Sequence, residues 1–187
     1  MNMLILASSS PRRSEILRMA GFEFTVAAPQ VHERLPHGTP PIQAVEQLAA
    51  RKARAAALEH PGEPVLAADT LVVFKNRILG KPKNEEDAKA MLRLLSGAVH
   101  QVYTGYCVLR GNDMLTGHEC TSVEFYTLRD AEIERYVATG EPMDKAGAYG
   151  IQGRGALLVK RIDGDFYNVM GLPIGKINRL LRESVGK

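Results

Sequence analysis

The stretch that decides the fold is LILASSSPRRSEIL, at Leu4–Leu17. Its apolar start is typical of a short buried strand, and Ser10 followed by Pro11 suits the N-cap and the first position of a helix. A strand that passes almost directly into a helix is typical of α/β folds. The helix begins with Arg12 and Arg13, where the helix dipole disfavours a cation by roughly 0.3–1 kcal/mol. Because a helix N-terminus attracts anions, we expect these arginines to serve an anionic ligand.

The rest of the chain alternates strand-like and helix-like apolar patterns. We expect strands at about 3–7, 23–28, 64–74, 78–79, 102–110, 114–126 and 156–162. We expect helices at about 11–20, 40–58, 85–96 and 129–139, and a last helix that Asn168 caps. This order predicts an α/β fold with a mixed β-sheet flanked by helices, in a single domain over residues 1–187.

The composition is that of an ordinary globular protein, with 45% hydrophobic and 24% charged residues. A net charge of +3, with both signs interspersed, gives no reason to expect a nucleic-acid surface. No apolar run approaches the ~20 residues of a membrane span, and the N-terminus lacks the pattern of a signal peptide. We therefore expect a cytoplasmic protein, with Cys107 and Cys120 as reduced thiols poorly placed for a disulfide.

Asp69 interrupts the apolar run PVLAADTLVVF at Pro64–Phe74. Burial of an unpaired carboxylate costs several kcal/mol, so Asp69 should be exposed in a cleft, paired with a cation, or bound to a metal. A structural aspartate bonded to backbone or to a lysine is the alternative. A purely structural strand would favour an apolar residue at this position, so we interpret Asp69 as functional.

Lys52 continues the apolar stripe of the expected helix at 40–58. The stripe has a spacing of three or four residues and consists of Val45, Leu48, Ala49 and Ala56. A lysine that extends its ammonium group from the end of a buried face is the alternative to a functional role. Arg51 and Arg54 lie at other angles on this helix, and we expect both to be solvated.

Three further features are weak signals when each is taken alone. Lys81 follows the hairpin that begins with the Asp69 strand, so the hairpin would return Lys81 towards Asp69. Glu33 lies in a loop, where a glutamate usually faces solvent. Glycines at 147–155 let backbone N–H groups approach a ligand, although the spacing is not that of a known phosphate-binding loop. Together with Asp69 and Lys52, these groups suit phosphoanhydride hydrolysis. That reaction needs cations to neutralise phosphate charge, and a carboxylate to activate water or hold a metal.

Five motifs taken together resemble the Maf family of nucleoside triphosphate pyrophosphatases, from about residue 4 to residue 182. They are LASSSPRRSEIL, AADTLVV, LGKP, DKAGAYGIQGRGA and FYNVMGLPI. The resemblance implies an α/β fold of two lobes around a central cleft, similar to the inosine-triphosphate pyrophosphatases. It also implies hydrolysis between the α and β phosphates, a divalent cation (Mg²⁺, Mn²⁺ or Co²⁺) and a homodimer.

The resemblance also assigns roles to individual residues. It implies that Asp69 is the proton acceptor and that Glu33 shares the metal with it. The phosphate-site positions correspond to Ser8, Arg13, Lys52 and Lys81. The positions linked to substrate choice correspond to Arg12, Thr70 and Gln152.

The AADT and GIQG stretches resemble the branch of the family that prefers dTTP and UTP. The amide of Gln152 offers both donors and acceptors, which suits the imide edge of thymine or uracil. We therefore predict a dTTP and UTP pyrophosphatase, which also accepts modified pyrimidine triphosphates. A 7-methyl-GTP pyrophosphatase and a non-hydrolytic nucleotide-binding regulator of septum formation are the alternatives.

Overall fold

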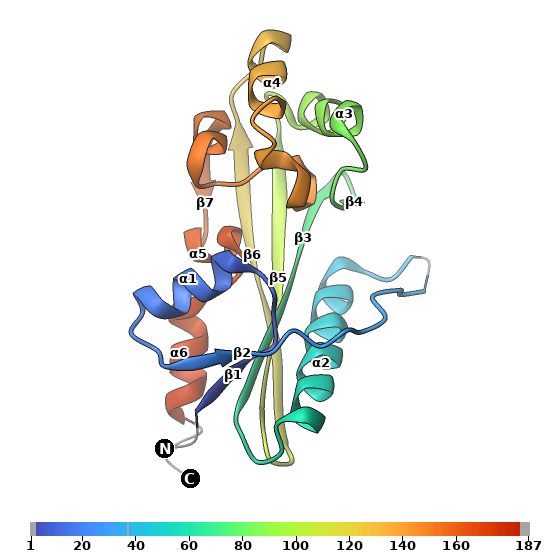
Figure 1. Ribbon diagram of the computed structural model, residues 1–187. Coiled ribbons are helices and arrows are strands. Elements are labelled where there is room, and N and C mark those ends of the chain that lie inside the picture. Colours follow the sequence, from blue (N-terminus) through green and yellow to red (C-terminus); the bar gives the residue numbers. More distant parts are fainter. Residues whose placement is uncertain (1–2, 37, 184–187) are drawn as a thin grey trace. The chain divides into compact units, whose positions relative to one another are not determined.

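The computed structural model describes residues 3–36 and 38–183 (Figure 1). Its strands are β1 (Leu4–Leu6), β2 (Phe24–Val26), β3 (Val65–Phe74), β4 (Arg77–Leu79), β5 (Val99–Arg110), β6 (Asp113–Phe125) and β7 (Val159–Asp163). Its α-helices are α1 (Pro11–Met19), α2 (Pro41–Glu59), α3 (Glu85–Leu95), α4 (Asp130–Val137), α5 (Phe166–Met170) and α6 (Ile174–Glu183). Short 3₁₀ helices are η1 (Glu141–Asp144), η2 (Ala146–Ala148) and η3 (Gly153–Leu158).

The strands form a seven-stranded mixed sheet in the order β2-β1-β3-β5-β6-β7, with β4 paired to β3. Strand β1 runs parallel to β2 and to β3, whereas the pairs β3–β4 and β6–β7 are antiparallel. Helix α1 connects the parallel neighbours β1 and β2, and helix α2 connects β2 to β3, which lies on the other side of β1. The predicted mixed α/β fold is therefore confirmed.

The chain divides into two compact units. The first unit comprises Met1–Asp69, Thr104–Glu119 and Gly171–Lys187, and the second comprises Thr70–Tyr103 and Cys120–Met170. Each unit has a hydrophobic core built from its own residues. Asp69 and Thr70, which are neighbours in β3, therefore belong to different units.

In the first unit, the alanine-rich face of α2 packs against β1 and the start of β3. The buried residues of this core are Ile5, Ala7, Ala49, Ala50, Ala53, Ala56, Val65, Ala67 and Cys107. The predicted inward stripe of α2 is confirmed, because all its apolar members are buried. Strand β5 approaches helix α2 closely at Gly105, where an added Cβ would lie 2.4 Å from the carbonyl oxygen of Val45.

In the second unit, α3 and α4 pack against each other (Figure 1). Asn84 caps α3 as predicted, because its side-chain oxygen accepts a hydrogen bond of 2.9 Å from the backbone N–H of Asp87. The centre of this core holds three edge-to-face aromatic rings, with centroids 4.7–5.3 Å apart: His100, Phe125 and Tyr149.

The prediction that Asn168 caps the last helix is wrong. Asn168 is buried inside the short helix α5, where its Nδ2 donates to the carbonyl of Val102 (3.0 Å) and to Oγ1 of Thr121 (2.9 Å). The last helix, α6, starts only at Ile174, because Pro173 has no N–H to continue the helical ladder and Gly171 has a φ of 109°.

One capping contact and one boundary also differ from the prediction. Ser10 occupies the N-cap position of α1, but its side chain makes no capping hydrogen bond. The strand expected at 156–162 begins at Val159, because the preceding residues form η3.

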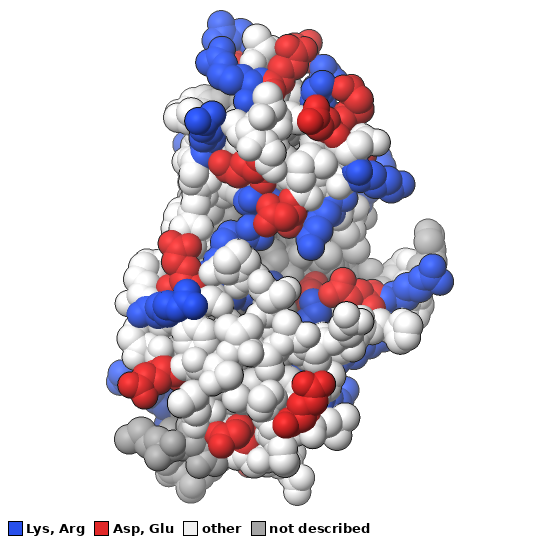
Figure 2. Space-filling model, in the orientation of Figure 1, with Lys and Arg blue, Asp and Glu red and all other residues white. Residues whose placement is uncertain are grey.

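The surface features agree with the modest charge of the chain. Figure 2 shows Lys and Arg interspersed with Asp and Glu over the visible face. Among the described residues, no helix is long and apolar enough to cross a membrane. Within the same residues, Cys107 and Cys120 are not joined by a disulfide, and burial raises the pKa of the Cys107 thiol to about 11.

Candidate active site

Arg13 is buried in the first turn of α1, with 8% of its surface exposed. Its Nη1 donates to Oγ of Ser8 (2.9 Å), and its Nε donates to the carbonyl of Gly171 (2.8 Å). Ser8 Oγ also accepts a hydrogen bond from the backbone N–H of Ser10 (3.2 Å). The bond to Gly171 joins the first turn of α1 to the segment before α6.

The electrostatic surroundings of Arg13 include charges of both signs. Burial lowers the pKa of Arg13, and the negative charge of Asp69 acts in the opposite direction. Arg12 lowers it further and Glu33 raises it, so all these groups lie within electrostatic range of the guanidinium. Arginine stays protonated in proteins, so Arg13 is a permanent buried cation.

Asp69, Lys52 and Glu33 form an ion-pair cluster in the first unit. Lys52 Nζ lies 2.5 Å from Asp69 Oδ1 and 2.8 Å from Glu33 Oε1. Only 15% of the Lys52 side chain and 14% of the Asp69 side chain are exposed, whereas 63% of Glu33 is exposed. The sequence left Asp69 exposed in a cleft, paired with a cation or bound to a metal, and the structure pairs it with Lys52. This ion pair therefore joins the apolar stripe of α2 to strand β3.

Arg51 makes contacts near Glu33 that the sequence did not reveal, although its side chain is partly exposed, as the predicted solvation requires. Its Nη1 donates to the carbonyls of His32 (3.0 Å) and Arg34 (2.9 Å). These two carbonyls flank Glu33, so Arg51 holds the backbone on both sides of that carboxylate. Every residue has a main-chain carbonyl, so the sequence does not show which residues Arg51 contacts. For this reason the sequence did not indicate the role of Arg51.

Three candidate residues lie in the second unit: Thr70, Lys81 and Gln152. Thr70 is partly buried in β3, Lys81 is exposed after β4, and Gln152 is partly buried at the N-cap of η3. The N–H of Gly147 donates to the carbonyl of Gly80 (3.0 Å), which joins the LGKP motif to the glycine-rich stretch. The return of Lys81 towards Asp69 stays a prediction.

The carboxylates of Asp69 and Glu33 suit a divalent cation that takes only one or two ligands from the protein. Asp69 and Glu33 both point an oxygen at the same cation, Lys52 Nζ. Among the described residues, no group of three or more His, Cys, Asp or Glu side chains can hold a metal. Mg²⁺ is commonly bound by one or two carboxylates together with substrate phosphates, so this donor set suits a cation whose coordination the substrate completes.

The first unit therefore has the composition of an anion site with a reactive carboxylate. A buried guanidinium, an ammonium and a hydroxyl can contact phosphate oxygens, and Asp69 can accept a proton beside them. The α/β fold and these groups suit one class of protein, an enzyme that hydrolyses phosphate-containing anions.

The profile of the family described as Maf-like protein matches residues 3–184, and the chain belongs to this family. A relative from Symbiobacterium thermophilum is 52% identical over 183 residues, covering 98% of this chain and 94% of its own. A relative from a Geobacillus species is 53% identical over 179 residues, covering 96% of each chain. One from Bacillus mycoides is 48% identical, covering 98% of this chain and 96% of its own. All three are named dTTP/UTP pyrophosphatase.

Proposed function

We propose that this chain hydrolyses dTTP, UTP and modified pyrimidine triphosphates between the α and β phosphates. The products are the nucleoside monophosphate and pyrophosphate. Relatives with this name share about half of their residues with the chain over nearly its full length. The observation that supports the chemistry is the pair of contacts Arg13–Ser8 and Lys52–Asp69, which combines phosphate-binding groups with a carboxylate.

In the proposed mechanism, Arg13, Lys52 and the Ser8 hydroxyl bind phosphate oxygens, and Lys81 adds a further cation. Asp69 accepts a proton from the attacking water. The water oxygen then bonds to the α phosphorus, while the bond to the bridging oxygen breaks and pyrophosphate leaves with the electron pair. Lys52 occupies one carboxylate oxygen of Asp69, and a carboxylate has several lone pairs, so proton transfer does not require that ion pair to break first.

Asp69 and Glu33 would hold the divalent cation, which is Mg²⁺, Mn²⁺ or Co²⁺ in this proposal. When bound, such a cation neutralises phosphate charge and polarises the scissile group. Lys52, which lies between the two carboxylates in the structure, would pair with phosphate oxygens in its presence.

Substrate choice belongs in this proposal to Arg12, Thr70 and Gln152. Thymine and uracil present a ring N–H between two carbonyl oxygens, and an amide side chain can complement a donor and an acceptor together. We also propose that the enzyme acts in the cytoplasm as a homodimer. This rests on the family resemblance, and light scattering on the purified chain measures the mass that tests it.

The experiment is a pyrophosphate-release assay on dTTP, UTP, CTP and 7-methyl-GTP with Mg²⁺, Mn²⁺ or Co²⁺. We expect the highest kcat/KM for dTTP and UTP, and loss of activity with a chelator. Preference for 7-methyl-GTP would overturn the substrate assignment. Binding of nucleotides without pyrophosphate release from any of them would overturn the enzymatic function in favour of a regulator.

A further inference from the structure

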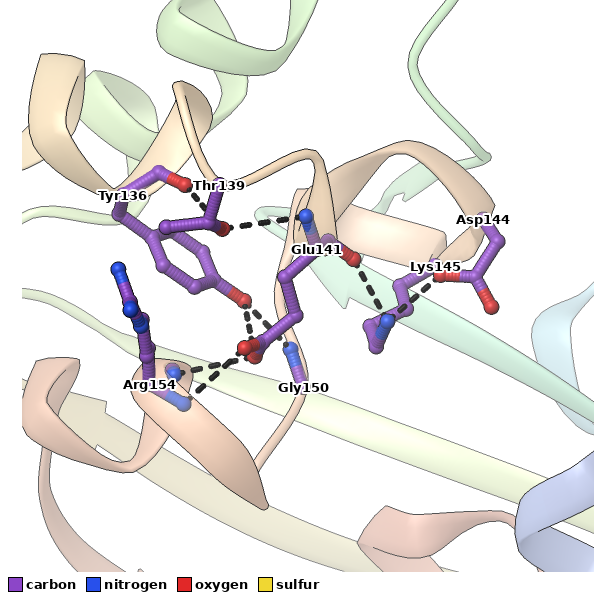
Figure 3. A network of polar contacts seen from close by, with 8 residues as sticks. Tyr136, Thr139, Glu141, Asp144, Lys145, Gly150 and Arg154 are labelled. Atoms are coloured by element: carbon purple, nitrogen blue, oxygen red, sulfur yellow. Dashed lines mark hydrogen bonds and ion pairs between the residues drawn. The ribbon is translucent and has the colours of Figure 1, made fainter.

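A hydrogen-bonded network in the second unit is centred on the carboxylate of Glu141 (Figure 3). Oε1 accepts hydrogen bonds from the Tyr136 hydroxyl (2.9 Å) and from the N–H of Gly155 (3.1 Å). Oε2 accepts one from the N–H of Arg154 (3.0 Å). The Glu141 carboxylate therefore binds the two backbone N–H groups that directly follow Gly153.

Tyr136 holds the other end of the same turn. Its hydroxyl donates to Glu141 and accepts a hydrogen bond of 3.1 Å from the N–H of Gly150. Tyr136 is buried on α4, and burial raises the pKa of its hydroxyl, so the group stays a donor at neutral pH. Gln152 lies between the two attachment points, Gly150 on one side and Arg154 on the other.

The turn from Gly150 to Gly155 leaves little room for adjustment. A Cβ at Gly155 would lie 2.1 Å from the carbonyl oxygen of Gly150, so the two ends of the turn are in direct contact. A Cβ at Gly153, whose φ is 65°, would lie 2.9 Å from Glu141 Oε2. The glycines at these positions allow the backbone to close around the carboxylate.

Glu141 is itself anchored by its main chain. Its N–H donates to Oγ1 of Thr139 (3.1 Å), and its carbonyl accepts a hydrogen bond of 2.6 Å from Lys145 Nζ (Figure 3). The Lys145 ammonium also donates to Asp144 (2.6 Å). The carboxylate is therefore presented to the turn from a fixed backbone.

We propose that Tyr136 and Glu141 are positioning residues for nucleobase selection, because they fix the turn that carries Gln152. The inference rests on the proposed function, in which Gln152 reads the base. An amide that is free to turn can present either its donor or its acceptor. It would then accept the cytosine edge, with a ring acceptor and an amino donor, as readily as the uracil edge. Selection of uracil over cytosine needs the amide to meet the base in one orientation, and a fixed backbone at Gln152 limits the positions from which the amide can reach the base.

The test measures the ratio of kcat/KM for UTP to that for CTP in Tyr136→Phe and Glu141→Gln. Phenylalanine removes the bonds to Gly150 and to Glu141, and glutamine places an amino group against backbone N–H donors. We expect each variant to lower the ratio about 10-fold, since small misplacements of a positioning group have effects of this size or larger. The matched controls are Tyr126→Phe and Glu134→Gln, both at exposed positions, and should keep the wild-type ratio.

A double-mutant comparison separates positioning from general destabilisation. In a Gln152→Ala background, Tyr136→Phe should lower the ratio no further, because the group that it positions is gone. A further fall in that background, or folded single variants with the wild-type ratio, would overturn the inference. Folding is monitored by thermal unfolding.

Three other outcomes are also decisive. If the wild-type chain releases no pyrophosphate from any triphosphate, the proposed function fails and the inference fails with it. If the wild type selects UTP and the variants do so equally, only the inference fails. If both variants fail to fold, amide exchange in the wild type decides. Slow exchange at Gly150, Arg154 and Gly155 is expected, and fast exchange at these amides would contradict a fixed turn.

Discussion

The candidate site residues of the two units are held by different kinds of groups. In the first unit, Arg13, Lys52, Asp69 and Glu33 place formal charges close together. In the second unit, the turn at 150–155 is shaped by backbone amides that one tyrosine and one glutamate hold in place. The first arrangement suits binding and cleavage of phosphates, which every nucleotide shares. The second suits selection among bases, which differ in shape and hydrogen-bonding pattern.

The difference predicts which kinetic quantity each change affects. Substitutions in the charged cluster should lower kcat/KM for all triphosphates in equal proportion. Substitutions in the turn should change the ratio between nucleotides.

Asp69→Asn should lower kcat by about 10³-fold for UTP and CTP alike, because an amide cannot accept the proton from water. The variant should still fold, because Lys52 keeps its ion pair with Glu33. Asp113→Asn, an exposed change of the same kind, serves as the control. Near-normal turnover in folded Asp69→Asn would remove this residue from the mechanism.

The second unit should lose stability in mild acid because of His100. Burial lowers the pKa of His100 to about 4, below the unfolded value near 6.5. Between these pH values the unfolded chain binds the extra proton and the folded chain does not. The free energy of unfolding should therefore fall by about 3 kcal/mol as the pH drops from 7 to 4. Chemical denaturation at several pH values measures this slope.

The pH slope should be smaller in His100→Phe, which keeps an aromatic ring beside Phe125 but cannot titrate. His100 Nε2 lies 2.7 Å from the Tyr149 hydroxyl, and its Nδ1 has no hydrogen-bond partner among the described residues. His60→Gln, at a partly exposed position, should leave the slope unchanged. A wild-type slope in His100→Phe would show that other groups cause the acid sensitivity.

Arg13→Lys should lower kcat/KM about 100-fold for every nucleotide. The guanidinium contacts Ser8 and Gly171 through different nitrogens, and an ammonium group cannot span both while facing a phosphate. Arg18→Lys, at an exposed position on the same helix, is the control. If Arg13→Lys has wild-type kinetics, Arg13 is structural.

Arg51→Ala should lower kcat/KM about 10-fold, with equal effects on UTP and CTP. The change removes the bonds to His32 and Arg34, so Glu33 is no longer held beside Lys52. Arg54→Ala removes the same charge from an exposed position of α2 and should have little effect. Equal losses in both variants would indicate a general charge effect.

Residues that contradict their own pattern could be selected from the sequence alone. Asp69 breaks an apolar strand and Lys52 continues an apolar stripe, so each was visible without a structure, and the ion pair joins them. Arg12 and Arg13 contradict the helix dipole in the same way. The alternation of elements was equally visible, because strand and helix periods are properties of the local sequence.

The same reasoning failed where a side chain bonds to the main chain of a distant segment. Arg51, Glu141 and Asn168 each hold backbone or polar groups many residues away. Their sequence positions suit an ordinary surface residue or a helix cap. Their roles depend on the register in which segments meet, and the local pattern does not determine that register.

The most direct test of the division between the units compares two variants on two substrates, with kcat/KM measured for UTP and CTP. Asp69→Asn should lower both values together and leave their ratio unchanged. Gln152→Ala should lower the ratio about 10-fold, chiefly through a loss on UTP. A ratio that changes in Asp69→Asn, or that stays at the wild-type value in Gln152→Ala, would contradict the account.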